Sequence, residues 1–70
     1  MKTMYDIQQF LRKYGTFIYT GNRLGDLQMM ELEINELYEL GFIENKTYME
    51  AKMILKKEIT STLKQKKGSH

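Results

Sequence analysis

Hydrophobic residues along this chain recur at the three-to-four-residue spacing of helices in three separate segments. The first segment covers about residues 3–14. Thr3 can cap its start, with Asp6 three residues later, and Gly15 can end it in a left-handed conformation. The side chains predicted to face inward are Ile7, Phe10, Leu11 and Tyr14.

The second segment covers about residues 22–40 and ends at Gly41. Its inward stripe is the widest of the three: Leu24, Leu27, Met30, Ile34, Leu37 and Tyr38. The third segment runs from about residue 46 to residue 64, with Asn45 or Thr47 as the cap. Its inward side chains are Tyr48, Ala51, Leu55, Ile59, Thr62 and Leu63.

Residues 16–20 join the first two segments as an extended stretch that is too short to build a sheet. The fold class that follows is all-α, a three-helix bundle with short loops. We expect one domain over residues 1–65, followed by a mobile basic tail over residues 66–70. Only one domain fits within 70 residues.

Composition points to a folded chain that relies on helix packing. The chain is 41% hydrophobic and contains no cysteine, which excludes disulfides and thiolate zinc sites as sources of stability. No stretch approaches the roughly 18 apolar residues of a membrane span, and the N-terminal residues lack the apolar core of a secretion signal. We therefore expect a cytoplasmic protein with no membrane association.

The net charge of +2 conceals an uneven distribution along the chain. Residues 1–23 carry four basic side chains against one acidic, residues 24–50 one against seven, and residues 51–70 six against one. An acidic middle helix between two basic segments would attract both of them.

The chemistry of catalysis is missing from the pattern. The single histidine, His70, lies at the chain end, so neither a catalytic triad nor a histidine-based metal site can be assembled around it. Five residues intervene between Gly15 and Gly21, where a phosphate-binding P-loop has four, and Asn22-Arg23 follows in place of Lys-Ser/Thr. We expect a non-enzymatic protein without catalytic residues, metal or cofactor.

One stretch, residues 12–23, interleaves basic residues, aromatic residues and glycines in a non-helical loop. Single-stranded nucleic acid is bound by cations along the phosphates and by aromatic faces that stack on bases, so this composition favours such a ligand. A basic flank of the third helix could add phosphate contacts. The candidate nucleic-acid-binding residues are Tyr5, Arg12, Lys13, Tyr19, Arg23, Lys52, Lys56 and Lys57.

Structural roles compete with this hypothesis. Tyr14, Phe17 and Ile18 are more simply explained as side chains that cover the core, whereas Tyr19 fits either role equally well. The lysine flank could be an ordinary solvated helix face, or it could be paired with the acidic second helix.

Two other kinds of partner have to be considered, a nucleic-acid duplex and a second protein chain. A duplex-reading helix–turn–helix would bring the acidic second helix onto the phosphate backbone, which argues against that mode of binding. Met29, Leu32 and Leu40 lie off the inward stripe. If they are exposed, they form a surface for a homodimer or another protein partner, and the chain is an interaction module.

The segment Arg-Lys-Tyr-Gly-Thr-Phe-Ile-Tyr-Thr-Gly-Asn-Arg-Leu at 12–24, preceded by Tyr-Asp-Ile-Gln-Gln, resembles the YqgQ-like family of small bacterial proteins. The similarity covers nearly the whole chain and excludes the C-terminal Lys-Gln-Lys-Lys-Gly-Ser-His. It implies a three-helix bundle. It also implies an uncharacterised function for which single-stranded nucleic-acid binding has been suggested, and it transfers no site residue.

Overall fold

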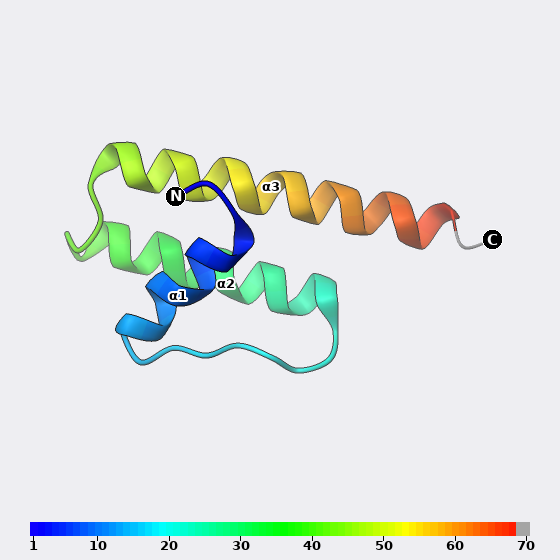
Figure 1. The fold of residues 1–70 in the computed structure, drawn as a ribbon, viewed down its shortest axis with the longest axis horizontal. Helices are drawn as coiled ribbons and strands as arrows, with labels where there is room; N and C mark the ends of the chain where they lie inside the picture. Colours follow the sequence, from blue (N-terminus) through cyan, green and yellow to red (C-terminus); the bar gives the residue numbers. More distant parts are fainter. Residues whose placement is uncertain (69–70) are drawn as a thin grey trace.

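The chain forms three helices, seen here in a computed structural model that describes residues 1–68, with side chains to residue 65. They are α1 (Met4–Lys13), α2 (Arg23–Glu39) and α3 (Asn45–Gly68), and no strand occurs among the described residues. Figure 1 shows α2 and α3 as a long hairpin, with the short α1 packed against it. The all-α, three-helix prediction is confirmed.

The start of α1 has the predicted capping box. The Asp6 amide donates to the Thr3 hydroxyl at 3.3 Å, and the Asp6 carboxylate accepts from the amides of Lys2 and Thr3 at 2.9 and 3.1 Å. Gly15 follows the helix with φ of +80°, and the Thr16 amide then donates to the Leu11 carbonyl at 3.0 Å. Both predicted ends of this helix are therefore confirmed.

The α2–α3 hairpin closes over a tight turn. The Asn22 side chain caps α2 by accepting from the Gly25 amide at 3.0 Å. Gly41 has φ of +86°, as predicted for a helix stop, and this lets the Phe42 amide donate to the Leu37 carbonyl at 2.9 Å.

The predicted cap of α3 is wrong. Asn45 and Thr47 both lie inside the first turn, because the helix begins at Asn45, directly after Glu44. The Asn45 side chain instead accepts from the Tyr38 hydroxyl at 3.1 Å. Helical backbone continues to Gly68 and so includes residues 66–68 of the predicted tail, while Ser69 and His70 lie outside the described residues.

The core is formed by all three helices and by one residue of the turn. Its buried hydrophobic residues are Ile7, Leu11, Leu27, Met30, Ile34, Leu37, Ile43, Ala51 and Leu55. Most of the predicted inward positions are therefore confirmed, and Phe10, Leu24, Tyr38, Tyr48, Ile59 and Thr62 are partly buried.

Two predicted core residues are exposed instead. Leu63 lies in the C-terminal part of α3, and Figure 1 shows that end of α3 extending beyond α2. Tyr14 follows the last residue of α1 and packs at the surface between two other aromatic rings, 5.1 Å from Phe10 and 5.6 Å from Phe42. Helical spacing predicts the direction in which a side chain points, but not whether another part of the chain lies there to cover it.

Candidate nucleic-acid interface

The loop between α1 and α2 runs in an extended conformation and is tied to α2 at both ends. At its start, the Thr16 hydroxyl lies 3.5 Å from a carboxylate oxygen of Glu33. At its end, the Thr20 amide donates to both carboxylate oxygens of Asp26, at 3.0 and 3.1 Å, and the Thr20 hydroxyl donates to Oδ1. These contacts fix the loop against the side of the bundle.

Asp26 was not predicted as a site residue, yet it is the buried carboxylate of the described structure, with 5% of its surface exposed. In the sequence it is one of the seven acidic residues of the middle segment, residues 24–50. The available signal was its position four residues before Met30 on the inward face of α2, where a charged residue needs a partner. That partner is the loop backbone.

Side chains of the extended loop alternate between the core and solvent. Ile18 packs against the core, whereas Phe17 and Tyr19 on either side of it point outward, with exposed fractions of 71% and 78%. The alternation follows from extended backbone geometry, which sends successive side chains in opposite directions. The predicted burial is thus confirmed in part for Ile18 and wrong for Phe17, and Tyr19 lies on the surface.

Three of the predicted site residues lie beside this loop. The Arg12 guanidinium lies 5.1 Å from the centre of the Phe17 ring, in cation–π geometry. Tyr19 and Arg23 line a small pocket of about 110 Å³ together with Gln8 and Asp26. The Arg23 guanidinium also donates to Glu58 of α3 at 3.0 Å, so part of its charge is already neutralised.

Tyr5 and Lys13 lie in a different groove. This open depression of about 510 Å³ runs along α1 and also includes Lys2 and Gln9. Asp6 lies there as well, and the backbone amides of Lys2 and Thr3 that donate to it lower the pKa of its carboxyl below 3.8. Tyr5 is exposed in this groove, as predicted.

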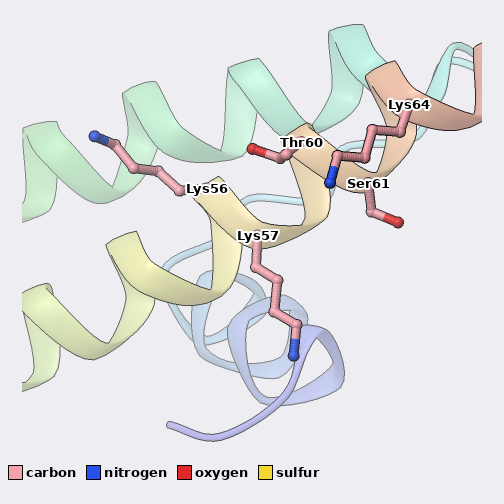
Figure 2. Close-up of a pocket in the computed structure, with 5 residues that line it drawn as sticks. All are labelled: Lys56, Lys57, Thr60, Ser61 and Lys64. Carbon is pink, nitrogen blue, oxygen red and sulfur yellow. The ribbon is translucent and has the colours of Figure 1, made fainter. Parts of the chain in front are cut away.

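The lysines of α3 do not form a single flank. Lys52 donates to Glu31 at 3.0 Å and to Asn35 at 3.1 Å. This lysine is therefore paired with the acidic second helix, which was the alternative to phosphate binding. Lys56 and Lys57 border a shallow groove of about 420 Å³ with Thr60, Ser61 and Lys64. Figure 2 shows the amines of Lys56 and Lys57 pointing in different directions from the helix.

An ion pair also holds the start of the chain against the hairpin. The Met1 amino group donates to Glu50 of α3 at 2.9 Å, and this contact lowers the pKa of the Glu50 carboxyl.

Among the described residues, no three acidic or histidine side chains are grouped so as to hold a metal ion. None of the described helices is both long and apolar enough to cross a membrane.

Comparison with known proteins gives a family. The model of the family described as YqgQ-like matches residues 1–61. The chain is also similar to the uncharacterised protein YqgQ of Bacillus subtilis (strain 168), with 37% identity over 62 residues that cover 89% of this chain and 87% of the relative. This chain therefore belongs to the YqgQ-like family.

Proposed function

We propose that this protein binds single-stranded nucleic acid along the exposed edge formed by α1 and the loop at residues 16–20. The observation that carries the proposal is the outward display of Phe17 and Tyr19 on backbone that is fixed from both ends. Two such rings, two residues apart on extended chain, are separated by about 7 Å along the backbone. Each ring offers a face on which one base can stack.

The cations that serve this edge are Arg12 and Lys13, at the end of α1 next to the loop. Arg12 already lies over Phe17, so it can contact a phosphate while its planar group extends the stacking surface. Arg23 and Lys52 have carboxylate partners, and we give them a smaller part in binding. Lys56 and Lys57 are exposed on α3 and would contact a longer strand.

Strand selectivity follows from the same features. A base can stack on Phe17 or Tyr19 only if it is not paired within a duplex, so we expect single strands to bind more tightly than duplexes. Glu36 and Glu39 are exposed on α2 and would repel phosphates from that side. We further propose that the protein acts in the cytoplasm by binding alone, without an enzymatic reaction.

The test is a fluorescence-anisotropy titration of labelled single-stranded RNA and DNA at two salt concentrations, with a duplex as control. Tyr19→Ala should weaken binding by about 1–3 kcal/mol, which is roughly 5-fold to 150-fold in Kd. It should barely change the melting temperature, because most of the side chain is exposed. Ile18→Ala is the matched control and should do the reverse, since Ile18 packs on the core.

Salt dependence tests the cations separately. For single strands the slope of log K against log salt falls by about 0.7 for each lost phosphate contact, so Arg12→Gln and Lys13→Gln should each flatten it by that amount. Binding that is absent at low salt, or that survives Tyr19→Ala and both cation variants unchanged, would refute the proposal.

A second candidate function, association with another protein chain, is favoured by a different observation. Met29 and Leu32 on α2 and Leu40 directly after it are all exposed, as that alternative required. None of them lines the pocket that Tyr19 and Arg23 share, so the two functions do not exclude one another.

A further inference from the structure

Helix α2 carries apolar side chains on two opposite faces. One face is buried in the core, and on the other Met29 and Leu32 are exposed, Leu32 with 66% of its surface. Glu36 continues this outer row, so that its members are spaced three and four residues apart. A surface helix normally has polar residues opposite its buried stripe, so a second apolar row indicates a missing partner.

Helix α3 carries a matching outer row. Met49 and Met53 are exposed, Met53 with 70% of its surface, and Lys46 comes three residues before Met49. The spacing is again three and four residues, the pattern that lets one helix pack along another. Lys46 ends this row with a positive charge where Glu36 ends the row on α2 with a negative one. Neither side chain belongs to an ion pair found among the described residues.

Both rows lie on the side of the hairpin that faces away from the core. Leu32 comes two residues after the buried Met30, and Met49 two residues before the buried Ala51. Two residues correspond to about 200° around a helix, so each outer side chain points nearly opposite its buried neighbour. α1 packs against the core side of the hairpin and leaves these rows uncovered.

The register of the hairpin is fixed by three contacts between its helices. Lys52 bonds to Glu31 at 3.0 Å, Tyr48 to Asn35 at 2.9 Å, and Asn45 to Tyr38 at 3.1 Å. The two helices run in opposite directions, and these contacts set which residue of α3 lies level with each residue of α2. This register determines what two copies would present to each other.

Consider two hairpins placed face to face and related by a two-fold axis parallel to their helices. Each α2 then lies against α3 of the other copy, antiparallel and without a shift along the axis. In that arrangement Met29 is level with Met53, Leu32 with Met49, and Glu36 with Lys46, to within two residues, or about 3 Å. The apolar residues meet one another and the opposite charges meet at the end of each row.

We propose that this chain forms a homodimer through the outer rows of α2 and α3, as an antiparallel four-helix bundle with α1 and the loop on its outside. The occupant of the face is a second copy because both rows and their register belong to one chain and complement each other twice across the axis. The proposal goes beyond nucleic-acid binding and does not depend on it. It leaves the loop edge of each copy free.

Sedimentation of the full chain without nucleic acid, over a range of concentrations, tests the proposal. The wild type should dimerise, whereas Glu36→Lys and Lys46→Glu should each weaken the dimer by about tenfold or more, because each places like charges together at both of the symmetry-related contacts between positions 36 and 46. An equal mixture of the two variants should restore the dimer, since every charge then meets its opposite. Circular dichroism of each variant verifies that the helices remain.

Lys2→Glu is the matched control. It makes the same charge change on an exposed side chain in the groove along α1, outside both outer rows, and it should leave the dimer unchanged. A wild type that stays monomeric at every concentration would overturn the proposal and assign the face to a different partner. Equally damaging would be a dimer that both charge variants leave intact, or a mixture that associates no better than its components.

Discussion

The contact between Asp26 and Thr20 predicts a local weakness that can be measured. Asp26→Asn removes the negative charge of the carboxylate that accepts hydrogen bonds from the amide and hydroxyl of Thr20. It also replaces one of the two acceptor oxygens by an NH₂ group, which cannot accept. Hydrogen bonds to a charged group contribute about 1.5–3 kcal/mol each. Thr20 is at the surface, so water can replace part of what is lost.

We therefore expect Asp26→Asn to lower the free energy of unfolding by about 2–3 kcal/mol, less than the sum of its bonds. For a domain of this size, each kcal/mol corresponds to about 4–8 °C in melting temperature, so the melting point should fall by roughly 10–20 °C. Thermal unfolding followed by circular dichroism measures this fall. Glu39→Gln, an exposed acid-to-amide change on the same helix, is the control and should change it little.

Hydrogen exchange then locates the effect. In Asp26→Asn the amides of residues 16–22 should exchange faster, while those in the middle of α2 and α3 should lose protection only as far as the overall stability falls. Binding of single strands should weaken as well, because the loop that displays Phe17 and Tyr19 would have to be ordered on binding. Unchanged melting and unchanged loop exchange would refute the role given to Asp26.

Four further variants test the helix ends. Thr3→Ala removes the cap of α1 and should destabilise the protein by about 1 kcal/mol in denaturant unfolding at neutral pH. Because the pKa of Asp6 is lowered in the folded state, the stability that its carboxylate adds is present above about pH 4 and is lost as the pH falls through its folded pKa. The stability difference between wild type and Asp6→Asn should therefore shrink on acidification, and a constant difference would contradict this account. Gly41→Ala should cost about 1–2 kcal/mol because φ there is +86°. Gly25→Ala should be neutral or stabilising, because the added methyl meets only ordinary contacts with Asn22; equal losses at both glycines would argue against the backbone explanation.

Sequence pattern by itself determined the number of helices, most of their ends and most of the core. Helix caps and stops act within a few residues, so Thr3 with Asp6, Gly15 and Gly41 could be recognised from their neighbours in sequence alone. The inward stripe of α2 could be found for the same reason, because helical periodicity sets which side chains share a face. These features need no knowledge of how the helices meet.

Only the tertiary structure decided which side chains are available to a partner. Lys52 and Arg23 were expected to be cations for phosphate, but each lies beside a carboxylate from the other helix of the hairpin, at a sequence separation that no local pattern encodes. Phe17 was expected in the core, but the extended loop packs Ile18 on the core and so directs Phe17 outward instead. Exposure and ion pairing depend on what lies opposite a residue in space, and that is set by helix packing.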